Sequence, residues 1–271
     1  MDGAGQAPQL EVRKVLNRMN RACSLLWILA AALPAPARTA CHAQSGARVV
    51  PLVELYTSEG CSSCPPADRW LSKQASSAGG QANFLAFHVD YWDETGWHDR
   101  FGSPAYSQRQ RQRVAAAEGG DTVYTPQVMV GSDVRVAWND PKRFQAALRS
   151  GPARASLALR LDRTSVGRWK ATVAERNVGV AAPGIRLWLA QYLDGQTTEV
   201  GAGENRGVTL HHDHVAVRLW GPWSLEDTKN QTQQVAFEAP SSPWGLLAFV
   251  QDPRRQTLQT LELPASRCAA E

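Results

Sequence analysis

Two cysteines three positions apart carry the most distinctive chemistry of this sequence. Cys61 and Cys64 enclose Ser62 and Ser63, and Pro65 follows directly. A C-x-x-C pair suits thiol–disulfide exchange or, with further ligands, zinc binding. A disulfide between cysteines so close together closes too short a loop to add much stability. A redox or metal role therefore outranks a structural one.

The flanking residues predict how the pair is positioned. The run 49–56 is aliphatic and β-branched, as in a strand, and a turn at 57–60 leads to the first cysteine. A helix is expected to continue from the pair through Lys73. Cys61 then lies at a helix N-terminus, where free amide groups and the helix dipole favour its thiolate. Cys61 is the expected nucleophile and Cys64, one turn further in, the resolving thiol.

The N-terminal 45 residues predict a leader for export. Basic residues between Arg13 and Arg21 precede an apolar stretch, Ala22 to Ala35, of about 14 residues. Spanning a bilayer takes roughly 20 apolar residues. We therefore expect residues 1–45 to be a signal peptide cleaved near Ala43, with Met19 as an alternative start. The mature protein is then periplasmic or secreted, without stable membrane insertion, and an uncleaved anchor is the alternative.

Cleavage at that point leaves Cys61, Cys64 and an unpaired Cys268. Three cysteines are too few for a disulfide framework. A structural zinc site normally needs a second ligand pair, for which the histidine-rich tract 211–214 is the other candidate. The competing interpretation of this tract is a solvated strand edge, and we expect no bound metal.

A second polar cluster lies in the segment 88–99, which overlaps the insertion expected at 92–104. Its members combine imidazoles and carboxylates: His88, Asp90, Asp93, Glu94, His98 and Asp99. They suit a hard-metal site. The preferred interpretation is that the aromatics pack the insertion down and the acids face solvent. A substrate-binding lip above the cysteines is a stronger alternative than a metal site, because long insertions beside a site often carry specificity.

Thr125 and Pro126 add to the signal of the cysteine pair. A proline that begins a β-type run needs a reason to be there, and an X-Pro bond is where a cis peptide costs least. We expect the Thr125–Pro126 bond to be cis, against the alternative of a trans proline that initiates a strand.

Four runs of sequence resemble a known bacterial family. They are VELYTSEGCSSCPPAD at 53–68, HVDYWD at 88–93, VYTPQ at 123–127 and GENRG at 203–207. The chain is similar over nearly its whole mature length to secreted thioredoxin-like proteins grouped as domain of unknown function 1223. This resemblance implies a thioredoxin-like fold and assigns no activity. The wider thioredoxin superfamily implies catalytic roles for Cys61 and Cys64, and a substrate-binding role for Thr125 and the cis-proline Pro126.

Two departures leave the redox potential open. Ser62 and Ser63 replace the Gly-Pro of thioredoxin, and Gly60 replaces the tryptophan that usually precedes the first cysteine.

Glu54 lies near the place where thioredoxins bury a carboxylate, although its offset from Cys61 is one residue longer. A buried acid there would relay the proton of the resolving cysteine, whereas a solvent-facing strand glutamate would not.

The remaining sequence predicts two domains. Hydrophobic residues make up 43% of the 271, charged residues 20%, and the net charge is +4, a globular composition with no basic stripe for nucleic acid. Strands alternate with helices over 46–151, which predicts an α/β domain with a mixed sheet flanked by helices, and the family resemblance implies that this domain is thioredoxin-like. Over 152–271 short alternating strands predict an all-β sandwich-like domain.

The function expected from these features is an exported thiol–disulfide oxidoreductase that acts through Cys61 and Cys64. Its partners would be exported proteins with thiols or disulfides, together with an unidentified redox partner, and no cofactor is implied. Two alternatives stay open. One is a non-catalytic binding or accessory module that uses the pair structurally, and the other is an exported zinc-binding protein. The direction of the redox chemistry is not readable from the residues.

Overall fold

A computed structural model describes Met1 and residues 40–77, 79–117, 122–176, 183–225 and 231–268. The basic and apolar stretches of the expected leader lie outside these residues. The described elements belong to one compact unit, Thr39–Glu271. Within the described residues, no helix is long and apolar enough to cross a membrane.

Two larger sheets and a hairpin make up most of this unit. The seven-stranded sheet has the order β13 (Thr257–Pro264), β12 (Trp244–Gln251), β7 (Arg186–Leu193), β10 (Val215–Ser224), β3 (Asn83–His88), β2 (Leu52–Thr57) and β4 (Gln127–Val130). The four-stranded sheet has the order β1 (Ala40–Gln44), β5 (Ser156–Ser165), β6 (Arg168–Arg176) and β11 (Gln231–Glu238). β8 (Gln196–Glu199) and β9 (Thr209–His212) form the hairpin. The described α-helices are α2 (Pro65–Ser77), α3 (Pro104–Ala116) and α4 (Pro141–Ala147).

The expected fold class is wrong. In place of a helix-flanked α/β domain followed by a separate β domain, strands from both parts of the chain form one mixed sheet. β3 pairs in parallel with β2 on one side and with β10, from the C-terminal part, on the other. β7, β12 and β13 then continue the sheet in antiparallel fashion. The unit is therefore mostly β-sheet.

Side chains of the central strands point alternately to the two faces of the sheet, and both faces are covered by other elements. In β12 every residue is buried. Leu246, Ala248 and Val250 face the four-stranded sheet, while Leu247 and Phe249 face the other way, toward the cluster that includes Tyr106 of α3. Such two-sided burial produces a continuous apolar run, which does not reveal the partners of the strand.

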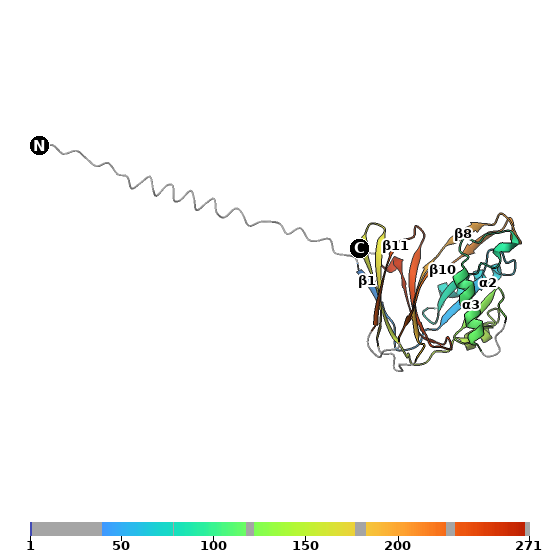
Figure 1. The fold of residues 1–271 in the computed structure, drawn as a ribbon, viewed down its shortest axis with the longest axis horizontal. Helices are drawn as coiled ribbons and strands as arrows, with labels where there is room; N and C mark the ends of the chain where they lie inside the picture. Colours follow the sequence, from blue (N-terminus) through green and yellow to red (C-terminus); the bar gives the residue numbers. More distant parts are fainter. Residues whose placement is uncertain (2–39, 78, 118–121, 177–182, 226–230, 269–271) are drawn as a thin grey trace. The chain divides into compact units, whose positions relative to one another are not determined.

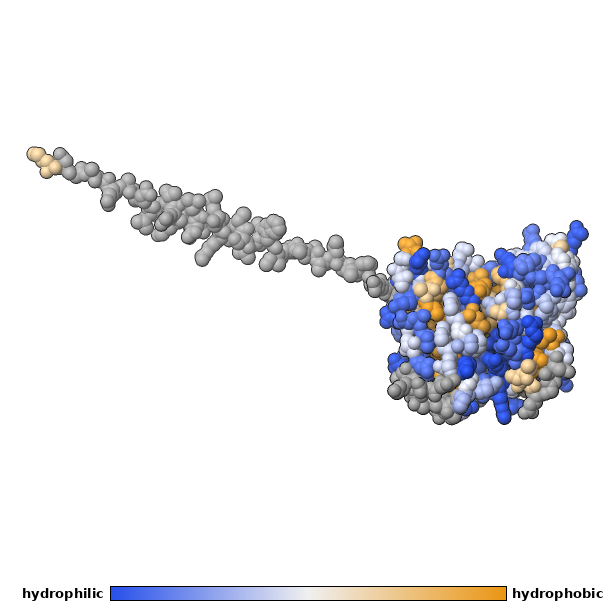
Figure 2. Space-filling view, viewed as in Figure 1, coloured by the Kyte–Doolittle hydropathy of each residue, from blue (hydrophilic) through white to orange (hydrophobic). Residues whose placement is uncertain are grey.

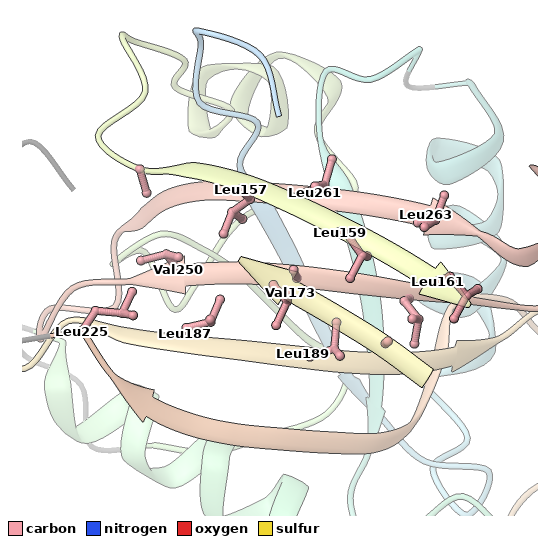
Figure 3. Packing of buried hydrophobic residues seen from close by; sticks show 14 of the residues in the cluster. Leu157, Leu159, Leu161, Val173, Leu187, Leu189, Leu225, Val250, Leu261 and Leu263 are labelled. Carbon is pink, nitrogen blue, oxygen red and sulfur yellow. The ribbon is translucent and has the colours of Figure 1, made fainter. Parts of the chain in front are cut away.

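The largest core lies between the two sheets. Figure 3 shows Leu157, Leu159 and Leu161 of β5 facing residues of β7, β12 and β13. At the other end of the seven-stranded sheet, α2 and α4 cover one face of β2, β3 and β4, and α3 packs on the opposite face. In Figure 1 the strands β1 and β11 lie on one side of the unit, and α2 and α3 lie on the other.

β1 ties the N-terminal end of the described chain to its C-terminal end. Its residues pair with β5, with Ala43 opposite Leu159. Cys41 forms a disulfide with Cys268, across 227 residues of sequence. Cys268 is therefore paired in the structure. Cleavage near Ala43 would remove Cys41 and most of this strand.

The surface drawn in Figure 2 is mainly hydrophilic, with hydrophobic side chains in separate patches. Among the described residues that follow β1, Tyr124, Val166 and Val208 are exposed large hydrophobics, and Tyr124 adjoins the loop of Pro126.

Candidate functional site

The cysteine pair lies where β2 turns into α2. Cys61 and Cys64 form a disulfide, with their Cα atoms 5.4 Å apart. Pro65 is the first residue of α2, where a missing amide donor costs no helical hydrogen bond. The Asp68 amide donates to the Cys64 carbonyl oxygen at 3.2 Å, so the helical pattern begins at the second cysteine. The pair therefore lies at the N-terminal end of the helix, which is the positive end of the helix dipole.

The disulfide is buried although the two serines between the cysteines are exposed. Cys61 and Cys64 have 0% of their surface accessible. The Cys61 Sγ lies 3.3 Å from the Ser63 Oγ. Gly60 packs against Trp92 so closely that an added Cβ would lie 3.2 Å from the Trp92 Cβ. The absence of a side chain at this position lets the loop pack beneath Trp92.

The loop of Pro126 lies beside the disulfide, and the Thr125–Pro126 bond is cis, as expected from the sequence. The Ser63 hydroxyl lies 3.5 Å from the Thr125 carbonyl oxygen. The Trp92 indole donates to the Thr125 Oγ1 at 2.7 Å. The structure therefore brings Cys61, Cys64, Thr125 and Pro126 together, although they come from separate segments.

The tip of the β8–β9 hairpin forms another side of the site. The Glu204 carboxylate accepts a hydrogen bond from the Ser62 amide at 3.0 Å. The buried Asn205 amide group donates to the carbonyl oxygens of Glu59 at 2.8 Å and Cys61 at 3.0 Å. Sequence reasoning treated 203–207 as part of a family resemblance and assigned it no chemistry. The Gly–Glu–Asn–Arg–Gly pattern indicated a feature of interest, but it does not predict contact with the cysteine loop at 59–62.

Beneath the disulfide loop lies a buried polar cluster, which consists of Glu59, Asp68, His88, Asp99 and His212. Each is at most 5% exposed. His88 Nδ1 donates to Asp99 Oδ2 at 2.6 Å, and Asp99 Oδ2 also accepts from the Glu59 amide at 2.9 Å. His212 lies between two carboxylates, with its Nε2 3.6 Å from Glu59 Oε1 and its Nδ1 3.8 Å from Asp68 Oδ2.

Electrostatics and burial shift the pKa values of this cluster in different directions. Burial favours neutral Asp99, but His88 and nearby amides outweigh it and lower the pKa of Asp99 to about 2. Burial disfavours protonated His88, yet Asp99 outweighs it and raises the His88 pKa. Burial raises the Glu59 pKa, but hydrogen bonding from the His212, Thr198 and Trp97 side chains together outweighs it and lowers the pKa. At Asp68 burial dominates over the attraction of His212 and His88, so its pKa is raised.

Glu54 occupies a different environment from the one that a proton relay requires. It is fully buried on β2 and forms an ion pair with Arg109 at 2.8 Å and a second with Arg113. It also accepts a hydrogen bond from the Tyr56 hydroxyl at 2.7 Å. Burial raises its pKa, but Arg109 and Arg113 outweigh this and lower it to about 2. A carboxyl group with this pKa remains ionised at neutral pH, so Glu54 serves as a buried counter-ion.

The other polar candidates divide between surface and core. His98 pairs with Asp93 at the surface, while His88 and Asp99 from the same segment enter the buried cluster. In the tract 211–214, His211 is exposed and His212 is buried. Within the described residues, no group of three or more His, Cys, Asp or Glu side chains is arranged to hold a metal ion.

Comparison with known proteins assigns the family. The family model described as "Protein of unknown function (DUF1223)" matches residues 52–251. The chain belongs to the DUF1223 family. The matched range runs from β2 to the last residue of β12, so it includes the cysteine pair, the cis-proline loop and the hairpin. Among curated proteins, none matches this DUF1223 chain.

Two solved structures resemble this DUF1223 protein. An X-ray structure of protein AGR_C_4864 from Agrobacterium tumefaciens has a TM-score of 0.56 and 22% identity, and the match covers 82% of this chain and 98% of that chain. HBP35 of Porphyromonas gingivalis has a TM-score of 0.60 and 15% identity, over 84% of this chain and 79% of that one. At such low identities the likeness shows the fold alone.

Proposed function

We propose that this DUF1223 protein is an exported thiol–disulfide oxidoreductase that acts through Cys61 and Cys64. The observation that carries the proposal is the position of the disulfide at the N-terminus of α2, beside the cis-proline loop. A helix N-terminus stabilises a cysteine thiolate and thereby makes the disulfide easier to reduce.

The reaction is an exchange of bonds between sulfur atoms. A thiolate of an exported substrate attacks the Cys61 Sγ, a new disulfide forms between substrate and Cys61, and the bond to Cys64 breaks with its electron pair on the Cys64 Sγ. A second substrate thiolate then attacks the substrate sulfur and releases Cys61 as a thiolate. The substrate dithiol is oxidised to a disulfide, and the protein disulfide is reduced to a dithiol. The reverse sequence reduces a substrate disulfide.

Export is part of the same proposal. The Cys41–Cys268 and Cys61–Cys64 disulfides both suit an oxidising compartment, such as the periplasm or the medium outside the cell. The mature protein would meet its thiol- or disulfide-bearing partners there, including a redox partner that returns the pair to its working state.

The complete burial of both cysteines favours a second candidate, a non-catalytic binding module in which the pair only fastens the loop to α2. For catalysis the segments packed against the cysteine loop, which include Trp92 and the hairpin tip at Asn205, must open to admit a substrate sulfur. The two functions therefore differ in whether an external thiol can reach Cys61.

Trapping separates these two functions. In a Cys64→Ala variant the resolving thiol is missing, so mixed disulfides with exported proteins should accumulate on Cys61. They should appear on non-reducing gels and disappear on reduction. A Cys61→Ala variant is the matched control and should trap none. If Cys64→Ala also traps none, the binding module is the better account.

A further inference from the structure

Several buried polar atoms below the disulfide have no hydrogen-bond partner within the described chain. They are both carboxylate oxygens of Asp68, both ring nitrogens of His212, His88 Nε2 and Glu59 Oε1. Unsatisfied buried polar atoms cost about 1–3 kcal/mol each, so native proteins contain few of them. Their concentration in one cluster beside a reactive pair is a feature that needs an explanation.

The position of Asp68 relates it directly to the second cysteine. It follows Cys64 by four residues, and its amide donates to the Cys64 carbonyl oxygen at the start of α2. Residues four apart lie on one face of a helix, so this hydrogen bond places Asp68 on the same side of the helix start as Cys64. Both residues are buried, at 0% and 5% exposure. A thiolate released at Cys64 therefore forms in a place that solvent does not reach.

His212 connects Asp68 to the loop that precedes Cys61. Its two ring nitrogens face the carboxylates of Asp68 and Glu59 at 3.8 and 3.6 Å. Both distances are within ion-pair range and slightly too long for a hydrogen bond. An imidazole placed between two carboxylates can pass a proton from one to the other.

We propose that Asp68, in contact with His212 from the β8–β9 hairpin, donates and accepts the proton of Cys64 during disulfide exchange. This inference rests on the proposed function and adds proton-transferring residues to it. When the substrate thiolate attacks Cys61, the electron pair of the broken bond moves to the Cys64 sulfur, which takes the proton of the Asp68 carboxyl group. In the reverse direction the Cys64 thiol gives its proton to the Asp68 carboxylate as its sulfur attacks the mixed disulfide on Cys61.

The groups around Asp68 fit this role. The ionised Asp99 is neutralised by His88, while His212 separates Glu59 from Asp68. Asp213, which adjoins Asp68 in the crevice between α2 and β9, accepts the Gly195 amide. Asp68 is the carboxyl group of the cluster whose pKa is raised, and burial is the main cause. It therefore holds a proton more readily than an ordinary aspartate does.

A two-phase thiol reaction tests the inference on the full-length protein. The reduced protein is mixed with the aromatic disulfide dithiobis(nitrobenzoate). Attack by Cys61 releases a first thionitrobenzoate, and attack by Cys64 on the resulting mixed disulfide releases a second. A Cys61→Ser, Cys64→Ser double variant supplies the background from other cysteines. Only the second phase requires the proton of Cys64 to leave.

In Asp68→Asn we expect the second phase to slow at least about tenfold near neutral pH, since general base catalysis contributes 10²–10⁴-fold. Its rate should then rise with pH toward the ordinary thiol pKa of about 8.5. The first phase should stay unchanged. His212→Gln should shift the second phase in the same direction, and His211→Gln, its exposed neighbour on β9, should leave both phases as in the wild type.

A second phase with the wild-type rate and pH profile in folded Asp68→Asn overturns the relay and leaves the proposed function standing. If Asp68→Asn does not fold, an unchanged second phase in His212→Gln has the same meaning. A wild-type protein with no first phase overturns the proposed function itself, and the relay with it.

Discussion

The Asn205 side chain donates a hydrogen bond to the carbonyl oxygen of Cys61 at 3.0 Å, across 144 residues of sequence. It also donates to the Glu59 carbonyl oxygen, so one buried amide group holds the loop on the N-terminal side of the disulfide. The neighbouring Glu204 accepts a hydrogen bond from the Ser62 amide on the exposed side of the loop. The β8–β9 hairpin, which comes from the C-terminal part of the chain, thus packs against the loop of the cysteine pair.

Asn205→Ala should loosen this closure. The two carbonyl oxygens of Glu59 and Cys61 would lose a buried donor, at a cost of about 1–3 kcal/mol. We expect dithiothreitol to reduce the Cys61–Cys64 disulfide faster in the variant than in the wild type, measured by alkylation and mass spectrometry. The exposed Arg206→Ala is the matched control. An unchanged reduction rate in Asn205→Ala would mean that the hairpin tip does not limit access.

The disulfide between Cys41 and Cys268 should contribute to global stability. It joins β1 to the end of the described chain and closes a loop with a sequence separation of 227. Cys268→Ser should lower the free energy of unfolding by about 2–5 kcal/mol, measured by urea denaturation. Non-reducing peptide mapping checks the bond itself, and a free Cys268 thiol in the native protein would contradict it.

If the proposed leader is cleaved, the same bond restricts the position of the cut. Because β1 pairs with β5 and carries Cys41, a cut that preserves this sheet edge lies on the N-terminal side of Cys41. Mass spectrometry of the exported protein should therefore find a mature N-terminus that retains Cys41. A mature chain that begins after Ala43 would show that β1 and its disulfide are absent from the working form.

His214 should make stability depend on pH. Burial disfavours its charge, but Asp194 and Glu262 outweigh burial and raise its pKa to about 9. A pKa raised from 6.5 gives a contribution that is complete below pH 6.5 and is lost as pH rises through about 9. One pKa unit corresponds to about 1.4 kcal/mol, so the contribution is on the order of 3 kcal/mol. Urea denaturation of wild type and His214→Gln should differ at pH 6 and converge near pH 10. A constant difference would refute this assignment.

Glu54 should behave as a structural counter-ion. Glu54→Gln would leave Arg109 and Arg113 buried without their negative partner, which typically costs about 3–5 kcal/mol. The thermal midpoint should fall, while the pH profile of the second thionitrobenzoate phase should stay as in the wild type. A profile that shifts in folded Glu54→Gln would restore Glu54 as a proton-transferring group.

Local sequence patterns predicted the local parts of the site. The aliphatic run before Cys61, the proline after Cys64 and the Thr125–Pro126 step each act through their immediate neighbours. They correctly indicated the strand, the helix and the cis bond. Short strands were also expected within 152–271, and β7 and β13 lie there.

Long-range partners were beyond the same reasoning. The fold class was wrong because β10 pairs with β3, a choice set by packing on both sheet faces and absent from either strand's own pattern. Glu54 was considered as a relay because it lies near the place where thioredoxins bury a carboxylate, but Arg109 and Arg113 reach it from α3. His212 appeared only as part of a histidine-rich tract, since the hairpin that carries it to Asp68 is not encoded locally.

The most direct test of the central claim is the reduction potential of the Cys61–Cys64 pair. The folded full-length protein is equilibrated in glutathione buffers of graded ratio, alkylated, and the peptide that contains both cysteines is measured by mass spectrometry. The account predicts a potential more oxidising than about −300 mV, because structural disulfides typically lie below that value. A pair that stays oxidised throughout and is reduced only after unfolding would contradict a catalytic disulfide.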